Sequence, residues 1–104
     1  MTEIRFTWNE AKNVANQKKH GISFEEAARV FLDPLHLSVP DRIEDREQRW
    51  QTLGLVGGVM ILLVAHTATE ERAGNQLTEV VRIISARPAT RKERMRYENG
   101  SLYP

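Results

Sequence analysis

The dipeptide Gly57-Gly58 constrains the fold of this chain more than any other sequence feature. It lies between two apolar segments, residues 50–56 and 59–66, and two residues that readily take positive φ are a common connection in a tight β-hairpin. The run Met60-Ile61-Leu62-Leu63-Val64 lacks polar alternation, which predicts a central strand covered on both faces. A further strand at residues 78–86 would pair with it. The sequence therefore predicts a β-meander as the centre of the fold.

Capping signals predict helices on either side of this meander. Asn9 is a good N-cap, and the pairs Ser23/Glu26 and Thr90/Glu93 have the spacing of capping boxes. The other predicted elements are, in chain order, a strand at 4–8, helices at 10–19 and 24–32, a strand at 35–39, a charged turn at 40–48, a mobile loop at 68–76 and a helix from residue 90 to about 99. With 104 residues we expect one domain, residues 1–104, of the α+β class. It would be an antiparallel sheet with two N-terminal helices packed on it and a C-terminal helix.

Composition argues against several classes of site. The chain has no cysteine, and its three histidines, at positions 20, 36 and 66, have no metal-ligand spacing, so we expect no metal site and no cofactor. The N-terminus has no basic start followed by an apolar run, and the apolar run at 59–65 is too short to cross a bilayer. We therefore expect a cytoplasmic protein without a membrane partner.

Positive charge is concentrated near the C-terminus. Residues 82–96 carry six basic side chains and one acidic one, a balance of +5, whereas the whole chain has a net charge of +1. Arginine dominates this cluster, and its planar guanidinium suits phosphate oxygens. The commoner interpretation of such a cluster is a solvated helix face with a few salt bridges. Charge alone therefore does not decide between a phosphate site and an ordinary surface.

A set of short motifs spans nearly the whole chain in a fixed order: Trp8, Lys12, Asn16, Lys19-His20-Gly21, Ser23-Phe24-Glu25-Glu26-Ala27, Phe31, Asp33-Pro34, Glu47, Arg49, Gly54 and Arg82-Ile83-Ile84-Ser85-Ala86-Arg87. Together these motifs resemble the BrnT-type toxins of bacterial type II toxin–antitoxin modules. One departure is Asn9, where the family usually has Asp. Because both residues cap helices well, we expect the same fold.

The resemblance implies a fold similar to the RelE toxins, ribonuclease activity and neutralisation by a BrnA-type antitoxin. The DNA-binding part of the antitoxin would carry the complex to operator DNA, so the toxin would meet that DNA only indirectly. RNA can be cut without metal when its own 2′-hydroxyl attacks the adjacent phosphate. Such a reaction needs a base, an acid and cations that stabilise the developing charge.

Four residues are our candidates for catalysis. Arg49, Arg82 and Arg87 would stabilise the phosphate, and His20 would transfer protons because histidine titrates near neutrality. Each has a structural alternative. Arg82 interrupts an apolar strand, so it either pairs with an acid, Glu47 or Glu79, or opens onto a functional surface. Arg49 could form a structural salt bridge, and a histidine at position 20 suits a helix C-terminus.

Four further residues are candidates for RNA binding. Lys12 and Lys19 are seven positions apart and share one face of the first helix. Arg94 and Tyr97 share a face of the last helix, where Arg94 could hold a phosphate and Tyr97 could stack on a base. The alternatives are a solvated lysine face and a tyrosine packed on the sheet. Trp8 and Trp50 are interpreted as core residues.

Two other functions remain open at this point. Toxins of the ParE group, which are related to the RelE fold, bind DNA gyrase and cleave nothing, and the basic cluster would suit a protein-docking surface of that kind. A chain that has kept the fold and antitoxin binding but lost activity is the third possibility.

Overall fold

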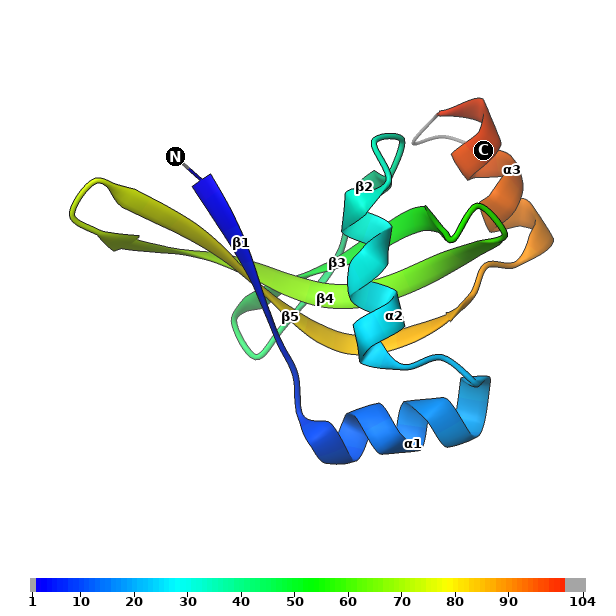
Figure 1. The fold of residues 1–104 in the computed structure, drawn as a ribbon, viewed down its shortest axis with the longest axis horizontal. Helices are drawn as coiled ribbons and strands as arrows, with labels where there is room; N and C mark the ends of the chain where they lie inside the picture. The colour runs from blue at the N-terminus through cyan, green and yellow to red at the C-terminus, as the bar shows by residue number, and fades with distance from the viewer. Residues whose placement is uncertain (1, 101–104) are drawn as a thin grey trace.

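The computed structural model of the protein describes residues 2–100 (Figure 1). It is a mixed α+β fold, as predicted. Its elements are β1 (Thr2–Thr7), α1 (Glu10–His20), α2 (Phe24–Ala28), the 3-10 helix η1 (Arg29–Leu32), β2 (Leu37–Glu44), β3 (Glu47–Val56), β4 (Met60–Ala73), β5 (Gln76–Pro88) and α3 (Arg91–Asn99). No helix among these residues is long and apolar enough to span a membrane.

The five strands form one sheet in the order β1-β5-β4-β3-β2. Strands β2 to β5 make the predicted antiparallel meander, and both Gly57 and Gly58 have positive φ in the β3–β4 turn. The prediction of a wholly antiparallel sheet is wrong, because β1 pairs with β5 in parallel. No hairpin sets the direction of β1, since helices rather than a tight turn follow it.

Two segments predicted as irregular are strands. β4 pairs with β5 as far as Ala73 opposite Gln76, so the predicted loop at 68–76 is mostly a long hairpin (Figure 1). β2 continues to Glu44, because Asp45 and Arg46 both take positive φ and make a two-residue turn without glycine. Polar composition misled the prediction in both places. These strands lie beyond the core, and their side chains are largely exposed.

The main core lies between the sheet and the second helical segment. Phe24, Ala27 and Val30 pack against Leu62 and Val64. The helix predicted at 24–32 is α-helical only to its fifth residue and then tightens into η1. Gly54 allows η1 to approach β3 closely, because a Cβ there would lie 2.6 Å from the Val30 Cβ. Glycine at this position is thus required by packing.

Polar contacts hold α1 in place, since its buried residues are Asn13 and Asn16. The Asn16 amide donates to the Ala86 carbonyl at 2.8 Å and accepts from the Ala86 amide at 3.2 Å. β1 ends opposite Arg82, so within residues 2–100 the β5 edge beyond that point has no strand partner on this side. Asn16 satisfies that edge, and α1 is anchored beside β5.

The other face of the sheet carries a second, smaller core at one end. Leu53, Leu63 and Ala89 form it, with Tyr97 of α3 packed against them. Both predicted capping boxes are present, and α3 ends at Gly100, which has positive φ. α3 has no buried residue, as its poor amphipathicity predicts. We call this side of the sheet the arginine face, because it carries Arg49, Arg82 and Arg87.

Candidate active site on the arginine face

The three candidate arginines lie on one face of the sheet. Arg82 and Arg87 pair with Thr67 and Leu63 of β4, which are four residues apart and therefore point to the same side. The register of β3 on β4 places Arg49 on that side as well. The main core occupies the opposite side. The strands thus bring Arg49 and Arg87, which are 38 positions apart in sequence, to the same face.

Arg82 forms an ion pair with Glu47, which is one of the two acids that the sequence suggested as its partner. The Arg82 Nη2 donates to the Glu47 Oε1 at 2.7 Å, from β5 to β3 across β4. The guanidinium does not enter the core, because the neighbouring Val81 and Ile83 occupy the buried positions. About half of the Arg82 side chain, 46%, is exposed. The pair therefore adds little to stability and leaves the cation accessible to a ligand.

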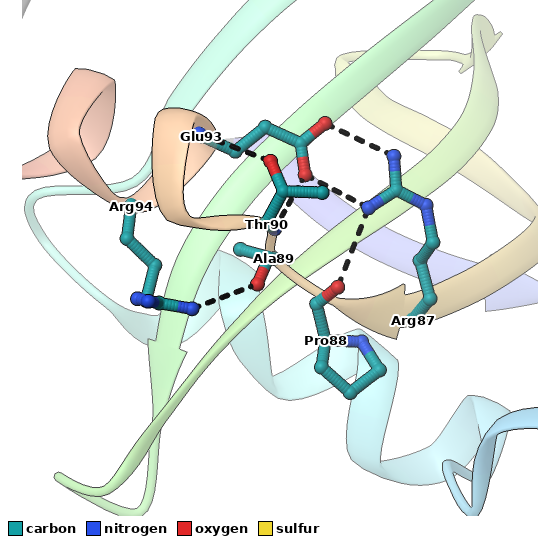
Figure 2. A network of polar contacts seen from close by, with 6 residues as sticks. All are labelled: Arg87, Pro88, Ala89, Thr90, Glu93 and Arg94. Carbon is teal, nitrogen blue, oxygen red and sulfur yellow. Dashed lines mark hydrogen bonds and ion pairs between the residues drawn. The ribbon is translucent and has the colours of Figure 1, made fainter.

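Arg87 is already engaged by a carboxylate. Its Nη1 and Nη2 donate to the two carboxylate oxygens of Glu93 at 2.8 and 3.0 Å, and Nη1 also donates to the Pro88 carbonyl at 3.3 Å (Figure 2). The Glu93 carboxylate also accepts from the Thr90 amide in the α3 capping box. The Arg87 guanidinium lowers the pKa of Glu93 to about 2, and the Glu93 carboxylate raises the pKa of Arg87. A phosphate at Arg87 must therefore compete with Glu93.

Arg49 has unused hydrogen-bonding capacity. Its Nε is buried and has no hydrogen-bond partner within residues 2–100. A buried donor without a partner is costly, so an added acceptor would stabilise Arg49; the Nε of Arg96 on α3 is in the same state within these residues. Hydrogen bonding and charge from Arg42, with charge from Arg49, lower the pKa of Glu44, so this end of the face also holds an ionised acid.

Tyr97 packs down on the sheet, which was the alternative to base stacking. Its hydroxyl donates to the Asp33 carboxylate, which also accepts from the Leu55 and Leu35 amides. Burial, together with Asp33, raises the pKa of Tyr97 to about 12. Burial alone would raise the pKa of Asp33, but these three hydrogen bonds lower it. The contact ties α3 to the loop after η1.

The remaining candidates lie at separate places. Arg94 is exposed on α3, and its Nη1 donates to the Ala89 carbonyl at 3.2 Å (Figure 2). Lys12 and Lys19 are exposed on α1. His20 is the last residue of α1, and in the described part of the chain no hydrogen bond or ion pair joins it to any of the three arginines. Within residues 2–100, His20 therefore has no polar contact with the arginines beside which its expected proton transfer would take place.

Sequence reasoning treated Glu47 only as an ion-pair partner. In the structure its carboxylate accepts a hydrogen bond from Arg82 on the arginine face. The signal was the alternation Glu47, Arg49, Gln51, which places all three side chains on one face once the strand is known to begin at Glu47. Among residues 2–100 no three His, Asp or Glu side chains gather as a metal-ligand set.

Comparison with known proteins identifies a family and a similar fold. The sequence profile of the family described as "Ribonuclease toxin, BrnT, of type II toxin-antitoxin system" matches residues 8–93, a range that includes Glu47, Arg49, Arg82 and Arg87. The chain is similar to the crystal structure of the Brucella abortus ribonuclease toxin, BrnT, with 24% identity and a TM-score of 0.59, over 88% of this chain and 99% of that one. At that identity the likeness concerns the fold alone. No curated protein matches the chain.

Proposed function

The chain belongs to the BrnT family of ribonuclease toxins of type II toxin–antitoxin systems, and from that premise we propose that it is a metal-independent endoribonuclease that inhibits translation by cleaving RNA. The observation that carries the proposal is the arginine face itself. Arg49, Arg82 and Arg87 lie on one side of the sheet, together with the carboxylate of Glu47. From the same family membership we propose that the fold belongs to the RelE-like group.

The proposed reaction uses the 2′-hydroxyl of the RNA as nucleophile. Its oxygen bonds to the adjacent phosphorus, the bond from phosphorus to the 5′-oxygen breaks, and the hydroxyl proton passes to Glu47. Arg82 holds that carboxylate in position through their 2.7 Å contact. Arg82 and Arg49 stabilise the negative charge that develops on the phosphate oxygens, and the leaving 5′-oxygen takes a proton from solvent.

The other expected roles depend on the path of the RNA. His20 can donate a proton only to a substrate that extends from the arginine face to the end of α1, where Lys12 and Lys19 would follow the RNA backbone. Arg94, exposed beside the second core, would contact phosphate, with the exposed part of Tyr97 next to a base. We therefore propose Arg49, Arg82 and Glu47 as the centre of the site.

Membership of a type II family implies a protein antitoxin. We propose a BrnA-type partner that covers the arginine face with acidic groups and so blocks RNA. The exposed surface of α3 offers a place for such a chain to bind, since no residue of that helix is buried. Operator DNA would be reached only through the antitoxin.

The test is incubation of the purified chain, freed of antitoxin, with naked RNA in excess EDTA. A matched RNA carries a single 2′-deoxy nucleotide at the cleavage position. We expect cleavage of the first RNA and none at the substituted position. Cleavage of both RNAs would exclude the 2′-hydroxyl mechanism. If the RNA stays intact and cells show DNA damage, the chain would instead be a gyrase-binding toxin. If naked RNA stays intact but RNA on ribosomes is cut, the chain would be a ribosome-dependent enzyme.

A further inference from the structure

A cavity of about 440 Å³ lies on the core side of the sheet, away from the arginine face. Its volume is within the range of ordinary ligand sites. Trp50 and Phe31 supply aromatic walls, and Ile4 of β1 forms part of the rim. Trp50 was expected in the core but is only half-buried, because its ring lines this cavity. The proposed ribonuclease mechanism uses no residue of the cavity.

A directed chain of hydrogen bonds ends in this cavity. The His66 Nδ1 contacts the Thr67 carbonyl at 3.1 Å, and since a carbonyl only accepts, Nδ1 carries the proton. Burial lowers the pKa of His66, whose imidazole is therefore neutral with Nε2 as acceptor. The Thr52 hydroxyl accordingly donates to Nε2, and the Ser38 hydroxyl donates to Thr52, each at 2.7 Å. Ser38 then presents only lone pairs to the cavity.

Two carboxylates add further acceptors to the lining. The His36 Nδ1 donates to the Asp33 carbonyl at 2.8 Å, since a carbonyl only accepts. Glu70 and Glu79 lie directly opposite each other on β4 and β5. Like charges in that position destabilise a sheet, and within residues 2–100 neither glutamate forms an ion pair. The cavity thus combines aromatic walls, acceptors and uncompensated negative charge.

We propose that this cavity binds the guanidinium group of an arginine side chain from a protein partner. A guanidinium has five donors and no acceptor, is always cationic and stacks on aromatic faces, so it complements the aromatic walls, the Ser38 lone pairs and the two glutamates. A lysine ammonium would use the charge but not the planar walls. RNA phosphate would be repelled by the two glutamates, so the cavity is not a continuation of the arginine face.

The partner follows from the position of the cavity. β1, which contributes Ile4 to the rim, is an edge strand, so an extended polypeptide can lie along it and place a side chain in the cavity. This part of the inference rests on the proposed function, in which a protein neutralises the chain. The binding of the guanidinium itself does not depend on ribonuclease activity, so the two can fail separately.

The experiment titrates N-acetyl-arginine N-methylamide into the full chain and follows the indole N–H signals by NMR. Trp50 reports on the cavity, while Trp8, whose Nε1 donates to Glu10, is the internal control. We expect a saturable shift of Trp50 alone. The double variant Glu70→Gln/Glu79→Gln should weaken binding at least about tenfold. Glu71→Gln, which alters an adjacent carboxylate on the other face, should bind like the parent.

Three further probes make the proposal falsifiable. The matching citrulline amide is neutral and nearly isosteric, and it should not bind. Equal binding by citrulline, or undiminished binding by the folded double variant, would overturn the proposal. Binding of guanosine in place of the arginine amide would show a base site for RNA. Binding of free agmatine alone would show a small-molecule site, and either result would exclude the arginine of a partner.

Discussion

The guanidinium of Arg87 and the carboxylate of Glu93 meet in two parallel hydrogen bonds of 2.8 and 3.0 Å across the turn from β5 to α3 (Figure 2). The same carboxylate closes the capping box of α3. The basic cluster is therefore not a row of free cations. One of its members is oriented and partly neutralised by an acid that is also needed to start the helix.

Glu93→Gln should strengthen RNA binding. Glutamine keeps the capping interaction with Thr90 but removes the negative charge that competes with phosphate at Arg87. We expect RNA affinity to rise by about fivefold, which corresponds to about 1 kcal/mol for one nearby charge. Filter binding at fixed salt measures this change. Unaltered affinity would mean that RNA does not reach Arg87.

The same ion pair predicts an acid-dependent part of the stability. The pKa of Glu93 falls from its ordinary 4.5 to about 2 on folding, so its contribution is fully present above about pH 4.5. It is lost as the pH falls from there through about 2. Denaturant unfolding of the parent and of Glu93→Gln over this interval should give free energies that converge. A constant difference between the two proteins would contradict the assignment.

Tyr97→Phe separates the hydroxyl contact from the ring. Loss of the hydrogen bond to Asp33 should cost about 1 kcal/mol of stability. Because folding raises the pKa of Tyr97 to about 12, this difference in stability should persist below pH 10 and vanish as the pH rises through 12.

RNA affinity should stay at the parent value in Tyr97→Phe and fall in Tyr97→Ala. A loss of affinity in the phenylalanine variant would show that RNA contacts the hydroxyl.

Gly54→Ala tests the close approach of η1 to β3. The added Cβ would lie 2.6 Å from the Val30 Cβ and 2.8 Å from the Val30 carbonyl oxygen, so backbone must move. We expect a loss of about 1–3 kcal/mol in denaturant unfolding. Gly57→Ala is the control, since a Cβ there meets nothing and only the positive φ is strained. Equal losses in both would refute the packing explanation.

Local sequence signals predicted the centre of the fold well. The Gly57-Gly58 hairpin and the Thr90/Glu93 capping box both appear in the structure, because each depends on residues close together in sequence. The parallel pairing of β1 and the edge contact of Asn16 were not predicted. Both depend on partners far along the chain, and no local pattern specifies such partners.

The candidate site shows the same division. Charge suggested Glu47, with Glu79 as the alternative, as the partner of Arg82. The common face of Arg49 and Arg82 was not predicted, because it depends on strand registers that no local pattern specifies. The engagement of Arg87 by Glu93 was missed, because the two are six positions apart and meet only through the turn at Pro88. The turn at Asp45-Arg46 was missed because non-glycine residues take positive φ there.

The central claim is that the arginine face is where RNA is cleaved. The most direct test compares cleavage rates of naked RNA in excess EDTA for the parent, Arg49→Ala, Arg82→Ala and Arg29→Ala, each with its thermal transition measured. Arg29 is an exposed arginine of η1, away from this face. We predict rate losses of about 10²–10³-fold for the first two variants, with folding retained, and a parent-like rate for Arg29→Ala. Parent-like rates in folded Arg49→Ala and Arg82→Ala would contradict the account.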